Sequence, residues 1–226
     1  SSRQVLRQGL RVLEHHGYGE LLQKYPVPEI GNPRIFRHQT YKFTLMWLKT
    51  VYLLGVFQSK LVEKLDDDFL ALDIGSSYGY FSSLLKSEYP ASCHVLVDFP
   101  EHLILAHYYL GSLFPDARIA GIGDVSTLDI LDNNTIKNYD FVLVPIQSFD
   151  ILNNDSSFDL VTNFVSLGEM TKKWFDNYLK SKVFTSSNYF FTTNRVESST
   201  TYGNQITILD YPIWDNDKKI HFSVYP

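Results

Sequence analysis

Phe69-Leu-Ala-Leu-Asp-Ile-Gly-Ser-Ser-Tyr-Gly-Tyr-Phe81 is the stretch that decides the fold, because an apolar run enters a glycine turn directly behind an acidic residue. The apolar run predicts a buried strand, and the turn after it predicts a small-molecule cofactor site. A dinucleotide-binding turn needs small residues at its first, third and sixth positions. Counting from Gly75, the sixth position is Tyr80, which is too bulky for that packing. The spacing therefore disfavours a nicotinamide dinucleotide.

The second glycine, Gly79, falls at the fifth position instead, and Asp73 stands two residues before Gly75. The pattern Asp-x-Gly-x-(Gly/Ser)-x-Gly after a strand resembles the first motif of class I S-adenosylmethionine (SAM) methyltransferases. This resemblance implies that Asp73 and the backbone of Gly75, Ser76, Ser77 and Gly79 hold the methionine end of SAM. Ser77 replaces a glycine of the motif, but serine is small and can itself form a hydrogen bond.

Length and composition limit the class of protein. With 226 residues and a hydrophobic fraction of 44%, the chain can form one main α/β domain. A formal net charge of -5 argues against a nucleic-acid-binding surface, although a local basic patch escapes a net count. Cys93 is the single cysteine, which excludes an intrachain disulfide and a cysteine-rich zinc site and predicts a reducing, cytoplasmic setting.

Other features are expected to be absent. No apolar run approaches the roughly 20 residues that cross a bilayer, and residues 1–30 lack a signal-peptide pattern. The histidines and carboxylates fall at no recognisable metal-ligand spacing, so we expect no bound metal. The first residue is Ser1 rather than Met, which leaves open whether the N-terminus is native. The sequence leaves the oligomeric state open as well, a homo-oligomer included.

Hydrophobic periodicity predicts the order of the elements. A helix is expected over residues 3–16 and a long apolar helix over about 39–64, so residues 1–65 are predicted to form a helical extension that caps a SAM-binding domain of residues 66–226. Strands then alternate with helices, which predicts a Rossmann-like α/β fold with a mostly parallel sheet. The strands are predicted at 69–74, 94–98, 140–144, 158–163 and 188–193, the helices at 79–88, 100–111 and 170–182, and a C-terminal antiparallel hairpin at 205–209 and 219–224.

Asp98 ends the second predicted strand, about 20 residues beyond the glycine turn. An acidic side chain at this position can accept hydrogen bonds from ribose hydroxyls. The alternative is that Asp98 is the N-cap of the helix that opens at Pro100. Gln147, just beyond the third predicted strand, is a candidate for binding the adenine edge, or else a surface amide without a ligand.

The fourth predicted strand ends at Asn163, and Ser166 and Glu169 follow it. Ligands of open α/β sheets gather outside the carboxyl ends of the strands, so these three residues are expected near the transferable methyl group. Glu169 is a candidate base, or an acid in the first turn of a helix. His38 is a second candidate base, since histidine accepts a proton near neutral pH, although a lone histidine is more often a structural residue.

Taken together, these motifs resemble those of a family of sugar O-methyltransferases. The family has a Glu-Ile-Gly-Gly-Gly-type first motif, an Asp-Leu-Pro-Glu second motif and an Asn-x-x-Ser-Leu-x-Glu-Met motif at the fourth strand. The resemblance covers roughly residues 30–200 and implies SAM as methyl donor and a hydroxyl of a sugar or polysaccharide precursor as acceptor. The chain departs from the pattern at Asp73 and at Ser76-Ser77. The matching segments are Leu72-Asp-Ile-Gly75, Val97-Asp-Phe-Pro-Glu101, Val144-Pro145 and Asn163-Phe-Val-Ser-Leu-Gly-Glu-Met170.

Two alternatives from other classes stay open. An NAD-dependent oxidoreductase is disfavoured by Tyr80 in the glycine pattern. A catalytically silent methyltransferase-like partner or regulatory subunit is favoured by Ser77 and by the lack of a decisive base. Binding of S-adenosylhomocysteine without methyl transfer would distinguish the silent protein from the enzyme.

Overall fold

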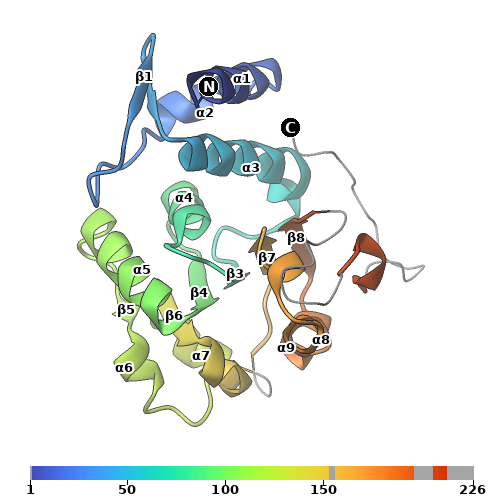
Figure 1. Ribbon diagram of the computed structural model, residues 1–226. Coiled ribbons are helices and arrows are strands. Elements are labelled where there is room, and N and C mark those ends of the chain that lie inside the picture. Colours follow the sequence, from blue (N-terminus) through green and yellow to red (C-terminus); the bar gives the residue numbers. More distant parts are fainter. Residues whose placement is uncertain (1, 153–155, 196–205, 213–226) are drawn as a thin grey trace.

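The centre of the protein, a computed structural model that describes residues 2–152, 156–195 and 206–212, is a six-stranded sheet (Figure 1). The strand order is β5-β6-β4-β3-β7-β8, and all neighbouring strands are parallel. The strands are β3 (Leu70–Ile74), β4 (Cys93–Asp98), β5 (Ile119–Ala120), β6 (Phe141–Pro145), β7 (Leu160–Phe164) and β8 (Tyr189–Thr193).

The order of the five longer strands confirms the Rossmann-like fold. From β3 in the middle, the chain moves outward through β4 to β6, and then returns to the other side of β3 to form β7 and β8. This reversal creates a switch point beside β3, which is where open α/β sheets bind their ligands. The short edge strand β5 is an addition that the sequence pattern did not predict.

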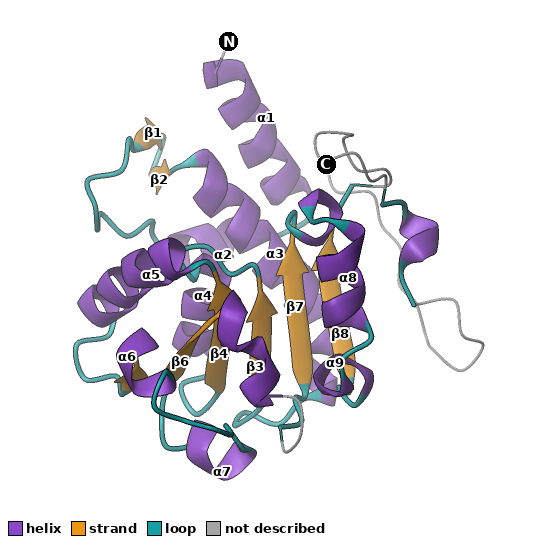
Figure 2. Ribbon diagram, turned by 60° about the horizontal axis from the view of Figure 1, so that its bottom comes forward, coloured by secondary structure: helices purple, strands orange, loops and turns teal. Residues whose placement is uncertain are grey.

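Helices cover both faces of the sheet (Figure 2). On one face, Ala71 of β3 and Leu96 of β4 pack under a first layer, while Leu72 and Val95 point to a second layer on the other face. The first layer is α3 (Leu45–Leu61), α4 (Tyr80–Glu88) and α5 (Pro100–Leu113), and the second contains α7 (Asn133–Ile136), η2 (Ile146–Leu152), α8 (Lys172–Leu179) and α9 (Lys182–Thr185), with α6 (Ile122–Val125) near the edge strand.

The N-terminal elements pack on the outer side of α3. Leu6, Leu10 and Leu13 of α1 (Ser2–His15) are buried in the same cluster as α3 and α4. Because α3 is covered on both sides, it is apolar around most of its circumference. The remaining elements are α2 (Gly19–Lys24), the antiparallel hairpin of β1 (Phe36–His38) and β2 (Tyr41–Phe43), and the turn η1 (Val62–Lys64). The division of the chain at residue 65 stays a prediction.

The structure corrects several predicted boundaries. The helix predicted over 39–64 begins at Leu45, because Tyr41–Phe43 pairs with Phe36–His38 in the hairpin. The helix predicted over 170–182 ends at Leu179, since the hydroxyl of Ser181 accepts a hydrogen bond from Phe184 N and starts α9.

The C-terminal hairpin is only partly covered by the described residues. Residues 208 and 209, predicted within a strand, belong to the 3-10 turn η5 (Ile208–Asp210), in which the Asp210 carboxylate accepts a hydrogen bond from Thr207 N. This part of the prediction is wrong, and the second strand, 219–224, lies outside the described residues. Across the described ranges, no helix combines the length and apolar character that a bilayer span requires.

His94 is completely buried near the start of β4. Its Nε2 lies 2.8 Å from Ser92 Oγ, and its ring stacks on Phe141 at 5.7 Å between centroids. Burial, with a smaller contribution from the Lys86 ammonium, lowers the pKa of His94 from its ordinary 6.5 to about 3. In the pH range from about 6.5 to about 3, the unfolded chain protonates this imidazole while the folded protein keeps it neutral.

His94 is expected to make stability depend on pH. Between pH 6.5 and pH 3 the unfolded chain binds a proton at this histidine, whereas the folded protein does not. The contribution of His94 to the free energy of unfolding is therefore complete above pH 6.5 and is lost as the pH falls toward 3. From pH 7.5 to pH 5 the free energy of unfolding should fall about 2 kcal/mol further in the wild type than in His94→Gln. Urea unfolding at several pH values measures the difference. His15→Gln, on exposed α1, is the control, and parallel pH curves for wild type and His94→Gln would contradict the assignment.

Candidate cofactor site

The glycine turn after β3 is fastened to the end of β4. Gly75 N donates to Val97 O at 2.8 Å, and Ser77 N donates to Asp98 Oδ2 at 2.7 Å. Ser76 N also donates to Val97 O, at 3.3 Å, so two consecutive residues of β4 hold three consecutive amides of the turn. The sequence pattern predicted that the turn and Asp98 belong to one site, and the structure shows a direct hydrogen bond between them.

Both glycines of the turn have backbone angles that other residues rarely adopt, with φ of 72° at Gly75 and 77° at Gly79. A Cβ at Gly75 would lie 2.0 Å from Ser166 Oγ, and one at Gly79 would lie 2.8 Å from Leu96 Cδ2. The turn is therefore packed against β7 on one side and β4 on the other. No side chain fits at either position without moving these neighbours.

Ser77 also lies in the left-handed region, with φ of 52°. A residue with a Cβ pays about 1 kcal/mol or more for this conformation. Ser77 therefore keeps the backbone shape that glycine would provide, and its amide still reaches Asp98. Serine in place of the glycine of the motif therefore raises the conformational energy of the turn but leaves its backbone path unchanged.

Ser76 carries a buried hydroxyl that lacks a partner. Its Oγ makes no hydrogen bond to any described residue, and the residue is only 7% exposed. Buried hydroxyls are normally satisfied, so an orphan at this point of the turn fits a site that gains its partner from a ligand.

Asp98 is largely buried and is held by three contacts. Oδ2 accepts from Ser77 N, while Oδ1 accepts from Phe99 N at 2.7 Å and lies 2.7 Å from His102 Nδ1. The helix N-cap is Phe99, and no side chain caps it, so the alternative N-cap role of Asp98 is wrong. A carboxylate offers about four acceptor positions. One position remains, which is enough for a single ribose hydroxyl.

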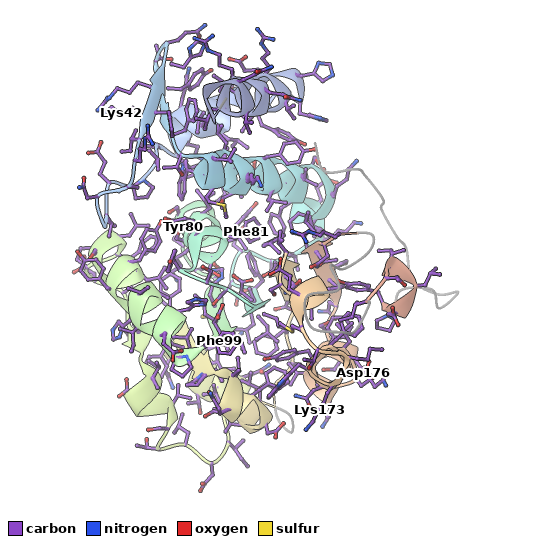
Figure 3. All side chains as sticks on the ribbon, viewed as in Figure 1. Lys42, Tyr80, Phe81, Phe99, Lys173 and Asp176 are labelled. Carbon is purple, nitrogen blue, oxygen red and sulfur yellow. The ribbon has the colours of Figure 1, made fainter. Side chains whose placement is uncertain are left out.

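Aromatic rings surround this carboxylate. Phe99, at the start of α5 (Figure 3), is 54% exposed although it is large and apolar, and Tyr78 is 39% exposed. The His102 ring lies between them, with centroid distances of 6.0 Å to Phe99 and 6.3 Å to Tyr78. The sequence pattern did not predict the role of His102, because Asp98 ends β4 while His102 lies in α5, so no helix periodicity joins the two residues.

Asp73 lies beneath the turn with its carboxylate inside the protein. Oδ1 accepts from Thr162 Oγ1 at 2.8 Å and Oδ2 from Ser82 Oγ at 3.1 Å. Burial raises the pKa of Asp73 to about 6, and the two hydroxyl donors oppose that rise. Asp73 is thus ionised at neutral pH in a place that disfavours its charge. A role in holding the methionine end of a cofactor stays a prediction.

Asn163 is the polar junction between β3, β7 and β8. Its Nδ2 donates to Ile74 O at 2.6 Å, and its Oδ1 accepts from Asn194 Nδ2 at 2.7 Å. Ser166 and Leu167 N complete its contacts. Because these bonds saturate the amide, Asn163 positions the loop beside Gly75, and direct contact with a cofactor stays a prediction.

Val165, next to this junction, has φ of 63°, a strained angle for a β-branched residue. Its side chain is 49% exposed, and its N–H donates to Thr193 O at 2.8 Å. Strained residues of this kind cluster at functional sites. The sequence pattern did not predict the strained backbone angle of Val165.

Among the described residues, no side-chain hydrogen bond or ion pair joins Gln147, Glu169 or His38 to the glycine turn. Gln147 is exposed in η2, one turn beyond the end of β6, whose Pro145 pairs with Asp98. Glu169 ends the 3-10 turn η3 (Leu167–Glu169), and its Oε1 lies 3.8 Å from Arg195 Nη2. Helix α8 starts only at Lys172, so a first-turn position for Glu169 is wrong. His38 lies half-buried on β1.

A cleft of about 530 Å³ lies elsewhere, between α5 and the loop that enters α6. Ile104, Tyr108 and Gly121–Asp124 line part of it, and none of the predicted site residues does. Over the ranges that the structure describes, no three His, Cys, Asp or Glu side chains are grouped to hold a metal ion.

No protein-family model and no curated protein sequence matches the chain. Among solved structures, it is similar to PKMT2 from Rickettsia typhi in complex with AdoHcy, with 19% identity, 50% of this chain and 18% of that chain covered, and a TM-score of 0.33. It is also similar to coclaurine N-methyltransferase bound to N-methylheliamine and SAH (11% identity, 84% and 56% covered, TM-score 0.43). A third is precorrin-6y C5,15-methyltransferase from Geobacter metallireducens GS-15 (19% identity, 71% and 70% covered, TM-score 0.38). The chain thus spans less than a fifth of the R. typhi protein. Likeness this distant carries no statement about reaction or substrate.

The left-handed conformation of Ser77 predicts an unusual effect of glycine. Ser77→Gly should raise the free energy of unfolding by about 0.5 to 1 kcal/mol, because relief of the strained angle outweighs the added freedom of the unfolded chain. Chemical denaturation measures it. Ser59→Gly is the control: Ser59 is exposed in α3 and does not have a positive φ, so glycine there should destabilise by about 0.5 to 1 kcal/mol. Equal destabilisation by both substitutions would contradict the assigned backbone.

Proposed function

We propose that the protein is a SAM-dependent O-methyltransferase that acts on a hydroxyl of a sugar or polysaccharide precursor. The observation that carries the proposal is the contact between Ser77 N and the Asp98 carboxylate beside the unpartnered hydroxyl of Ser76. It places a compact glycine turn, an acidic acceptor and a free hydroxyl together at the carboxyl ends of β3 and β4. That combination suits a ligand with a ribose and a polar tail.

The residues present fit SAM. Asp98 would hold one ribose hydroxyl with its remaining acceptor position, Phe99 would present its exposed ring to the adenine, and Gln147 lies beyond the neighbouring strand for the adenine edge. The Gly75 to Gly79 backbone and Ser76 Oγ would hold the methionine end. When bound, SAM supplies an activated methyl group, which an acceptor hydroxyl oxygen receives as its proton leaves.

A dinucleotide fits less well. The sixth position of the turn, Tyr80, is occupied by a ring that lies 5.9 Å from Trp47 and 5.1 Å from Tyr109 between centroids. These contacts fix an aromatic side chain where a dinucleotide-binding turn needs a small residue for close packing of helix on strand. This observation supports SAM over NAD.

The sugar acceptor rests on the resemblance of the three motifs. We propose Glu169 and His38 as alternative bases for the hydroxyl proton. Glu169 is 54% exposed on its side chain and faces Arg195, so it is available to an acceptor that displaces this weak ion pair. The silent methyltransferase-like partner is the second candidate, favoured by the exposed position of Glu169, whose carboxylate contacts Arg195 rather than the turn.

Two measurements on the purified chain test the proposal. Calorimetry should show binding of S-adenosylhomocysteine and not of NADH. Transfer of label from methyl-labelled SAM to a panel of monosaccharides and oligosaccharides should then show a methylated sugar. Tight binding without transfer to any hydroxyl acceptor would favour the silent partner, and binding of NADH alone would overturn the cofactor.

Asp98→Asn is expected to weaken S-adenosylhomocysteine binding about tenfold or more. The substitution keeps the side chain's size but removes the charge from the ribose hydrogen bond, which is worth about 1.5 to 3 kcal/mol. Calorimetry measures the dissociation constant, and circular dichroism confirms that the variant is folded. Asp116→Asn removes an exposed carboxylate elsewhere and should leave affinity unchanged. Equal affinities of a folded Asp98→Asn variant and the wild type would refute the ribose contact.

A further inference from the structure

The charges of the chain are divided unequally between its two parts. Residues 1–65 contain ten Lys and Arg against four Glu, a formal charge of +6, and residues 66–226 contain ten against 21 acidic residues, a formal charge of -11. The net charge of -5 conceals this division. The N-terminal extension is thus a cationic unit attached to an acidic domain.

Among the described residues, three arginines of the extension lack an acidic partner, whereas Lys24 pairs with Glu88 and Lys42 with Glu29. Arg7 and Arg11 are exposed on α1 and Arg37 is exposed on β1, and within the described part of the chain none of the three forms an ion pair. Six cations of the remaining chain, in contrast, lie within 4.0 Å of a carboxylate: Lys86, Arg118, Lys137, Lys172, Lys180 and Arg195. Among the described residues, no neighbouring carboxylate therefore cancels the positive charge of these three arginines.

The β1–β2 hairpin concentrates this charge. Its register sets Arg37 directly opposite Lys42, and both are exposed. Like charges opposite one another across a strand pair destabilise it. Lys42 has one neighbour of opposite sign, Glu29 at 3.6 Å, and Arg37 has none among the described residues. The fold gains nothing from this pairing, but a shared anion would satisfy both cations.

The hairpin leads directly into α3, which contacts the residue after the glycine turn. Five residues after Lys42 (Figure 3), the ring of Trp47 contacts Tyr80, the residue that follows Gly79. In Figure 2, β7 and β8 point toward the end of the molecule at which α1 and the hairpin lie. The cationic hairpin therefore lies beyond α3 (Figure 1), on the side of the molecule toward which the carboxyl ends of β7 and β8 point.

We propose that the acceptor is an anionic saccharide, one that carries a phosphate or carboxylate group, and that Arg37 and Lys42 bind this group. The proposal rests on the proposed methyl transfer and specifies its substrate class. Arginine suits either anion, since its planar guanidinium forms two parallel hydrogen bonds with carboxylate or phosphate oxygens.

Calorimetry with glucose 1-phosphate, glucuronate and glucose tests the proposal, with and without S-adenosylhomocysteine and at low salt. The wild type should bind at least one anionic sugar five- to tenfold more tightly than glucose, and the preference should fall as salt is added. Arg37→Gln/Lys42→Gln should lose the preference. Lys137→Gln/Lys180→Gln, two cations that precede the amino ends of β6 and β8, removes the same charge and should retain it.

The same titrations separate the two proposals. If S-adenosylhomocysteine fails to bind while the anion preference depends on the hairpin, the cofactor proposal fails and the anion site stands. Equal affinity of the wild type for glucose and both anionic sugars would overturn the anion site, as would a hairpin variant that keeps the preference. Binding to phosphatidylglycerol vesicles that is lost in Arg7→Gln/Arg11→Gln, without any preference among the sugars, would also overturn it by assigning the charge to a membrane surface.

Discussion

The candidate site depends on one constraint: the turn after β3 is bonded to the last residues of β4. Gly75 N and Ser77 N donate to the Val97 carbonyl and the Asp98 carboxylate, and these two bonds set the path of the backbone between a central strand and its neighbour. The close packing at Gly75 and Gly79 and the strained angle of Ser77 follow from this path. The same bonds leave one acceptor position of Asp98 free, so the architecture of the turn also limits what the carboxylate can bind.

The sheet around this turn contains two buried groups with opposite effects on stability. His94, near the start of β4, opposes protonation, with a pKa of about 3, while Asp73, near the end of β3, resists ionisation, with a pKa of about 6. As the pH falls below 6, the folded protein gains a proton at Asp73 and the unfolded chain gains one at the histidine, so the two effects partly cancel. The ionised carboxylate of Asp73, directly beneath the turn, thus costs folding free energy at neutral pH.

Local sequence patterns were sufficient for the five long strands, the α4 and α5 helices and the contact region of Gly75 and Asp98. Each of these elements has a strong local signal: a fully apolar run, a glycine turn, or a proline at a helix start. The pattern failed where tertiary contacts decide, as in the β1–β2 hairpin, whose residues 41–43 look helical alone but pair with 36–38. The sequence pattern also did not predict the role of His102, which is recognised only from its contact with Asp98. The strained backbone angle of Val165 was not predicted either, because residue type does not indicate it.

A crystal structure of the chain with S-adenosylhomocysteine tests the central claim most directly. The account predicts one ribose hydroxyl within hydrogen-bonding distance of Asp98 Oδ2, with the bonds from Ser77 N and His102 retained, and a ligand atom within reach of Ser76 Oγ. A ligand bound in the cleft between α5 and α6 would contradict the account. A ribose that Asp98 does not contact would contradict it as well.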